Sequence, residues 1–145
     1  MSLTEEDIED YLEAFPYLID PIFSKEQYSV LRQYTIENNR IDLLIQNDSI
    51  KIITIIEIKK TKLQKVHYNQ IIRYYDLIKL KFPNYFVNGF LIGFKNLREN
   101  DFNKKEWLYI KYLNEDIPSK IKICKSCKKP INYTLYECTF CFQRY

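Results

Sequence analysis

The sequence predicts a mixed α/β fold, in which helices flank a sheet, followed by a small cysteine-containing unit. Two segments have apolar residues at helical spacing, and the segments around them are rich in β-branched and aromatic residues. All four cysteines come after residue 120. The expected order of the main elements is helix, three strands, helix, two strands, which is typical of a mixed sheet with helices packed on it.

The first expected helix covers residues 5–15. Thr4 can serve as its N-cap, the acids of its first turn complement the helix dipole, and apolar residues recur at helical spacing from Ile8 onward. The second expected helix covers residues 63–82 and ends close to Pro83, because proline cannot continue a helix.

Five segments have the composition of strands. The first three are separated by turn signals, Asn38-Asn39 and the polar residues 47–49. The expected strands cover residues 28–36, 40–46, 50–58, 85–94 and 106–113.

The composition indicates a globular protein with an uneven charge distribution. Hydrophobic residues make up 46% and charged residues 28%, with a net charge of +3. No apolar run reaches the roughly 18 residues of a membrane span, and the acidic N-terminus lacks the layout of a secretion signal; an intracellular protein is expected. Residues 1–20 are acidic, whereas residues 59–81 and 119–145 are basic. Such basic blocks are either solvated surface or nucleic-acid contacts.

The cysteines form two pairs, Cys124-x2-Cys127 and Cys138-x2-Cys141. This spacing predicts one structural zinc ion held by four thiolates in a zinc-ribbon hairpin. Two disulfides and an iron–sulfur cluster are the alternatives. With a boundary near Pro118, the expected domains are a core at residues 1–118 and the ribbon at 119–145. The ribbon can be a structural cap or a contact for nucleic acid.

Two acids interrupt the most strand-like segments, Asp42 in "RIDLLI" and Glu57 in "IIEIKK". Lys59 shares a strand face with Glu57, because residues two apart project to the same side. If the two strands pair, Asp42 can lie beside Glu57, and two carboxylates at the rim of a sheet suit a hard divalent cation. The alternative is an acid in a turn and a surface Glu–Lys pair, but a buried charge without a partner is costly.

Four stretches carry a resemblance to a known family: "TEEDIEDYLEAFPYLI", "RIDLLI", "IIEIKK" and "QIIRYY". Their order resembles the PD-(D/E)XK nuclease superfamily and, more narrowly, the NucS/EndoMS-type endonuclease domain, over about residues 4–80. The resemblance implies a restriction-endonuclease-like fold. It also implies a homodimeric DNA endonuclease, dependent on Mg²⁺ or Mn²⁺, that hydrolyses phosphodiester bonds in branched, mismatched or single-stranded DNA.

The resemblance also implies roles for individual residues. Asp42 and Glu57 would bind the metal, and Lys59 would complete the catalytic core. Gln70 and Tyr74 would support it from the second helix, and Glu5, or failing that Glu9, from the first. Arg40 and Arg73 would be DNA contacts or, equally well, salt-bridge partners. The basic blocks add Lys60, Lys125, Lys128 and Lys129 as expected DNA contacts.

Two departures from the family leave mismatch specificity open, and two other functions are alternatives to a nuclease. The separate N-terminal domain usual in NucS-type proteins is missing from this sequence, and a predicted zinc ribbon follows the core instead. The alternatives are a catalytically inactive module that binds nucleic acid and a zinc-ribbon adaptor that binds a protein partner.

Overall fold

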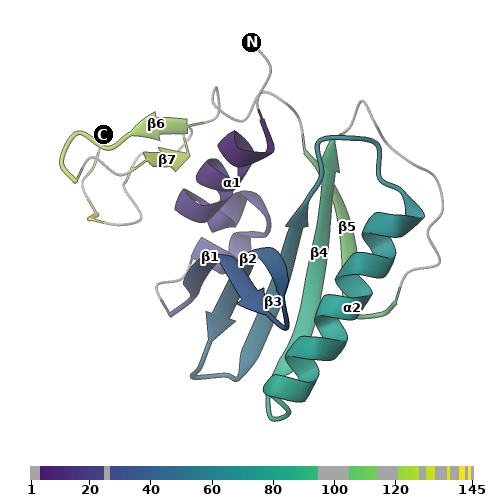
Figure 1. The fold of residues 1–145 in the computed structure, drawn as a ribbon. Helices are drawn as coiled ribbons and strands as arrows, with labels where there is room; N and C mark the ends of the chain where they lie inside the picture. Colours follow the sequence, from purple (N-terminus) through teal and green to yellow (C-terminus); the bar gives the residue numbers. More distant parts are fainter. Residues whose placement is uncertain are drawn as a thin grey trace.

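The computed structural model describes residues 4–24, 27–94, 105–113, 121–127 and 130–132, and the single positions 137, 141, 142 and 144. In this part of the chain, two α-helices lie against opposite faces of a five-stranded sheet (Figure 1). Neither helix of the described residues is long and apolar enough to cross a lipid bilayer.

Helix α1 covers Glu5–Ala14 and helix α2 covers Lys65–Lys81. A capping box starts α1: the Thr4 hydroxyl accepts the Asp7 N–H, and the Asp7 carboxylate accepts the Thr4 N–H. Two short 3₁₀ helices follow, η1 at Pro16–Leu18 and η2 at Pro21–Ser24. Each begins with a proline, whose fixed φ suits the first position of a helix.

The sheet has the strand order β1-β2-β3-β4-β5. Strands β1, β2 and β3 pair antiparallel, whereas β3, β4 and β5 pair parallel, so α2 is the crossover between β3 and β4. The bounds are Ser29–Ile36 for β1, Asn39–Asn47 for β2, Ile52–Ile58 for β3, Phe86–Phe94 for β4 and Leu108–Leu113 for β5.

A hydrophobic core lies on each face of the sheet. On one face, Ile8 and Leu12 of α1 pack with apolar residues of β2, β3 and β4. On the other, Ile71 and Ile78 of α2 pack with a second set from the same strands. Strand β3 is buried on both faces, which explains why five of its seven residues are isoleucine.

The predicted fold class and element order are confirmed, and no expected boundary in the core differs from the observed one by more than two residues. Two further strands, β6 at Ile121–Ile123 and β7 at Pro130–Asn132, form an antiparallel hairpin in the cysteine-containing segment. The predicted boundary near Pro118 lies outside the described residues.

Candidate active site

Asp42 and Glu57 meet where β2 and β3 separate. The last paired residues of this ladder are Leu43 and Ile56, so Asp42 and Glu57 come next on their strands. There the carboxylates replace the backbone ladder: Glu57 Oε1 accepts the Asp42 N–H at 3.0 Å, and Asp42 Oδ2 accepts the Ile58 N–H at 2.8 Å. Each carboxylate is therefore held by a backbone N–H of the other strand. Strands β2 and β3 pair as the predicted site requires.

Burial dominates the electrostatics of these two acids. Only 1% of Glu57 is exposed, and burial, followed by the charge of Asp42, raises its pKa to about 8. Burial also raises the pKa of Asp42 to about 6, with a further contribution from the charge of Glu9. The site therefore disfavours two ionised carboxylates unless a positive charge joins them.

Lys59 supplies one positive charge beside the acids. Its Nζ lies 3.7 Å from Glu57 Oε2, and 20% of its side chain is exposed. Its backbone N–H donates to Ile92 O at 2.8 Å, which fixes Lys59 against β4 just beyond the end of β3. The amine is therefore held at the carboxylates and is still accessible from solvent.

Helix α1 brings two glutamates to this end of the sheet. Glu5 is half-buried, its Oε1 accepts the Lys60 N–H at 3.0 Å, and its charge contributes to the raised pKa of Asp42. Glu9 is 7% exposed, and its charge contributes to the raised pKa values of both Asp42 and Glu57. The helical spacing favoured Glu5, but Glu9 is the more buried of the two, and its charge raises the pKa of Asp42 more than the charge of Glu5 does.

Helix α2 directs Tyr74 toward the carboxylates. Tyr74 is buried, and its pKa is raised by burial and then by the negative charges of Glu57 and Asp42, while a hydrogen bond with the Gln70 side chain opposes the shift.

His67 has a structural contact: its Nδ1 accepts the Gln64 N–H at 3.1 Å at the start of α2. Burial and the charge of Lys59 lower the pKa of His67.

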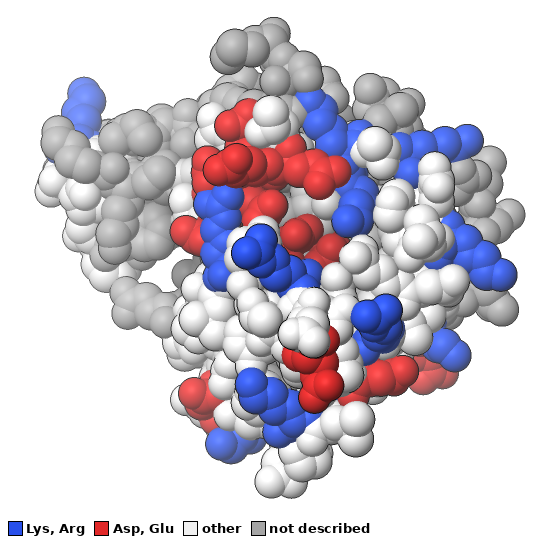
Figure 2. All heavy atoms as spheres, viewed as in Figure 1, with Lys and Arg blue, Asp and Glu red and all other residues white. Residues whose placement is uncertain are grey.

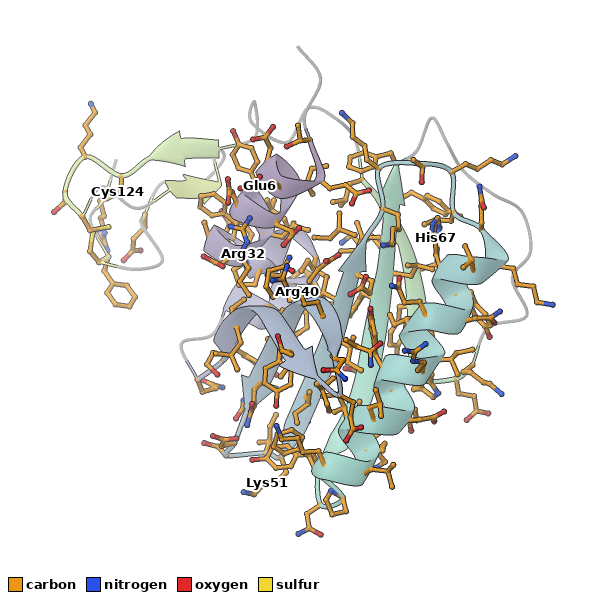
Figure 3. The ribbon with its side chains drawn as sticks, in the orientation of Figure 1. Glu6, Arg32, Arg40, Lys51, His67 and Cys124 are labelled. Carbon is orange, nitrogen blue, oxygen red and sulfur yellow. The ribbon has the colours of Figure 1, made fainter. Side chains whose placement is uncertain are left out.

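Basic side chains surround the acidic centre. Figure 2 shows acidic side chains gathered over α1 and the adjoining end of the sheet, with Lys and Arg side chains on both sides. Arg40, labelled in Figure 3, is exposed at the start of β2. Arg73 Nη2 donates to Asn39 Oδ1 at 2.6 Å, which places this arginine beside the same strand. Lys60 is half-buried next to Lys59.

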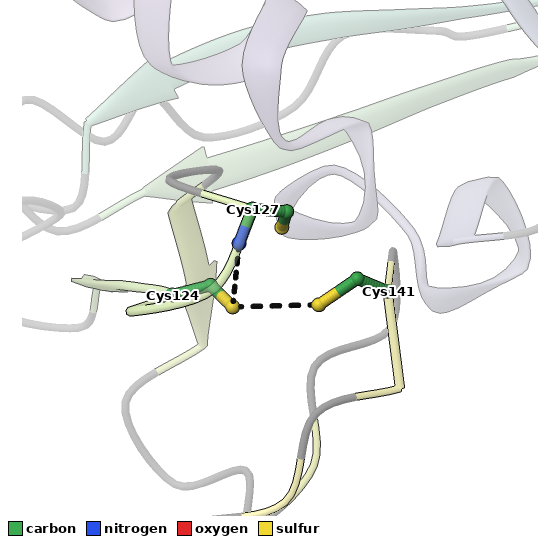
Figure 4. Close-up of side chains that lie close together, drawn as sticks. All are labelled: Cys124, Cys127 and Cys141. Carbon is green, nitrogen blue, oxygen red and sulfur yellow. Dashed lines mark hydrogen bonds between the residues drawn. The ribbon is translucent and has the colours of Figure 1, made fainter.

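Three of the four cysteines lie together (Figure 4). The Sγ atoms of Cys124, Cys127 and Cys141 are all within 4.8 Å of one another, and Cys124 Sγ accepts the Cys127 N–H at 3.5 Å. Cys124 Sγ and Cys141 Sγ are 3.6 Å apart, too far for a disulfide of about 2 Å and close to the roughly 3.8 Å between sulfurs on tetrahedral zinc. Cys138 lies outside the described residues.

The remaining predicted DNA contacts belong to this cysteine-containing unit. Lys125 is exposed, and Lys128 and Lys129 lie outside the described residues.

The donor sets fit the two predicted kinds of ion. The carboxylates of Asp42 and Glu57 are the oxygen ligands that Mg²⁺ and Mn²⁺ prefer. A divalent cation there would stabilise the ionised carboxylates, which burial and then neighbouring negative charges disfavour. The three thiols are soft ligands placed to bind one zinc ion.

Comparison with known proteins adds two solved structures. No protein-family model and no curated protein sequence matches the chain. A repair endonuclease from Pyrococcus abyssi is 20% identical, with a TM-score of 0.61 over 79% of this chain and 49% of that one. EndoMS in complex with double-stranded DNA is 18% identical, with a TM-score of 0.62 over 79% of this chain and 47% of that one.

The chain thus spans about half the length of each of these two proteins. At this level of identity the likeness establishes the fold: the chain has the restriction-endonuclease-like α/β fold of the NucS/EndoMS repair endonucleases.

Proposed function

We propose that this protein is an intracellular, metal-dependent DNA endonuclease that hydrolyses phosphodiester bonds in branched, mismatched or single-stranded DNA. The observation that carries the proposal is the pair of carboxylates at the separation of β2 and β3, with Lys59 Nζ 3.7 Å from Glu57 Oε2. The fold shared with two repair endonucleases, one of them solved with double-stranded DNA, supports the same activity.

Each residue of the proposed site has a role that follows from its chemistry. Asp42 and Glu57 would hold Mg²⁺ or Mn²⁺, which when bound lowers the pKa of water and stabilises charge on a phosphate. Lys59 is accessible enough to contact a phosphate oxygen while Glu57 holds its amine in place. Tyr74, with Gln70 hydrogen-bonded to it, forms the wall of the site on the side of α2.

The DNA would lie over the basic residues that border the acidic centre. Arg40 comes two residues before Asp42, Lys60 follows Lys59, and Arg73 reaches Asn39 at the start of β2. Guanidinium and ammonium groups contact phosphates without regard to sequence. We also propose that Lys125, Lys128 and Lys129 of the cysteine-containing unit contact DNA. Two copies of the chain would be needed to cut both strands, so we propose a homodimer, which light scattering of the purified protein would test.

A cleavage panel tests the activity. Wild type, Glu57→Ala and Lys59→Ala are compared on supercoiled plasmid, mismatched duplex, branched DNA and single strands, with Mg²⁺ or Mn²⁺. Cleavage should fall by at least about 100-fold in both variants. DNA binding by Lys59→Ala should stay within about threefold, because neighbouring basic residues still contact the backbone.

Two results would contradict this reading. If wild type and Glu57→Ala are equally inactive on every substrate but bind DNA, the chain is a binding module with a nuclease-like fold. If Lys59→Ala loses binding and cleavage to the same extent, Lys59 serves to hold DNA.

We further propose that Cys124, Cys127, Cys138 and Cys141 bind one structural zinc ion. The convergence of three sulfurs and the Cys127 N–H···Sγ contact favour this assignment. Four thiolates leave no open coordination position, so the role is structural. Elemental analysis should find about one zinc per chain; iron with visible absorption would indicate a cluster instead.

A further inference from the structure

Gln33 has an unusual backbone for the middle of a strand. Its φ is 52°, in the left-handed region that residues with a Cβ rarely adopt. The ladder between β1 and β2 pairs Arg32 with Leu43 and Tyr34 with Ile41, but not Gln33 with Asp42 between them. The departure from strand geometry therefore lies directly opposite a proposed metal ligand.

The left-handed residue has a consequence for Glu9. Gln33 Nε2 donates to Glu9 Oε1, and Arg32 Nε lies 3.4 Å from the same oxygen. Consecutive residues of a regular strand point to opposite faces of the sheet, so these two side chains could not both reach one carboxylate oxygen. The positive φ at Gln33 is what allows them to do so.

Glu9 is in turn linked to the catalytic carboxylates. It is 7% exposed, α1 packs against β1, β2 and β3, and the charge of Glu9 acts on both Asp42 and Glu57. One hydrogen bond, from Gln33, and one ion pair, with Arg32, therefore fix the orientation of Glu9. A strained backbone that persists beside a site is a sign of such a constraint.

We propose that Gln33 is a positioning residue of the active site: its left-handed backbone directs its amide to Glu9 and holds that carboxylate beside Asp42 and Glu57. The inference rests on the proposed function for its effect on cleavage, but its effect on cation binding can be measured without DNA.

Gln33→Gly separates backbone shape from the side-chain contact. Glycine accepts φ of 52° without strain, so the melting temperature should stay within about 3 °C of wild type. Without the amide, Glu9 loses its hydrogen bond from β1 and keeps the ion pair with Arg32. The affinity for Mn²⁺, measured by titration calorimetry on the zinc-loaded protein without DNA, should fall about 10-fold, as should cleavage at limiting Mg²⁺.

Two further variants complete the design. Gln33→Asn keeps an amide and tolerates a positive φ, but it is one methylene too short to reach Glu9, so it should match Gln33→Gly. Thr35→Gly, at an exposed position of the same strand, is the control for glycine in β1. It should lower the melting temperature by about 4 °C and leave Mn²⁺ affinity unchanged.

Mn²⁺ affinity decides the proposal. Wild-type affinity in both Gln33 variants would overturn it, and so would a wild-type protein that binds no Mn²⁺. If both variants bind Mn²⁺ more weakly but wild type cleaves no DNA, the positioning role holds and the proposed nuclease function fails.

Discussion

The buried carboxylate of Glu57 should make the metal-free protein less stable as the pH rises. Folding raises its pKa from the usual 4.5 to about 8, so the folded chain holds a proton more tightly than the unfolded chain does. The stabilising effect of that proton is complete below pH 4.5 and is lost as the pH rises through 8. The raised pKa of Asp42, about 6, has the same sign over a lower range of pH.

The size of the effect follows from the shift. One pKa unit corresponds to about 1.4 kcal/mol, so raising the pH from 5 to 8 should cost roughly 3 kcal/mol through Glu57. Glu57→Gln removes this dependence, because an amide oxygen can still accept the Asp42 N–H but the side chain does not ionise. At pH 8 the variant should therefore melt about 10 °C above metal-free wild type, with little difference at pH 5.

The measurement is thermal unfolding at several pH values between 5 and 8. Mg²⁺ should be removed by gel filtration, because a chelator would also take zinc from the cysteines. Glu106→Gln, at an exposed position, controls for the loss of a negative charge. Adding Mg²⁺ at pH 8 should stabilise wild type and not Glu57→Gln. A constant difference in melting temperature between wild type and Glu57→Gln from pH 5 to 8 would refute the predicted role of Glu57.

Three further substitutions test the rest of the fold. Leu12→Ala should destabilise the protein by about 3 kcal/mol in denaturant unfolding, because Leu12 is fully buried under α1; a loss below 1 kcal/mol would mean that α1 is not packed on the sheet. Arg32→Met should cost about 1–2 kcal/mol, because the buried Glu9 loses its ion pair and the Arg32 guanidinium no longer donates to Asp10; unchanged stability would contradict these contacts. Cys124→Ser should reduce bound zinc from about one to near zero per chain while the core still unfolds cooperatively; retained zinc would exclude Cys124 as a ligand.

Most of the sheet could be predicted because its patterns are local. The turn signals between β1, β2 and β3 set the register, and that register places Asp42 and Glu57 next to each other. The long apolar run of β3 indicates burial on both faces. Burying an ionised acid within it costs free energy, which a ligand or a charged partner must offset.

The acid of α1 could not be chosen from sequence alone. Glu5 and Glu9 are four residues apart and share one helix face, so their spacing does not distinguish them. Their difference comes from β1, where Arg32 and Gln33 reach Glu9, and from Lys60, whose N–H meets Glu5. The left-handed Gln33 was missed as well: glutamine carries no sequence signal for a positive φ, unlike glycine or asparagine.

Two departures from ordinary strand chemistry therefore converge on one place. Glu57 puts a buried carboxylate at the end of β3, and Gln33 interrupts the pairing of β1 opposite Asp42. Either one alone could be a local accident of packing. The two departures come from different strands, and Glu9 joins them. If stability were the only requirement, each departure would need its own separate explanation. The divalent cation of our proposal would account for both, since it needs the carboxylates ionised and held in fixed positions.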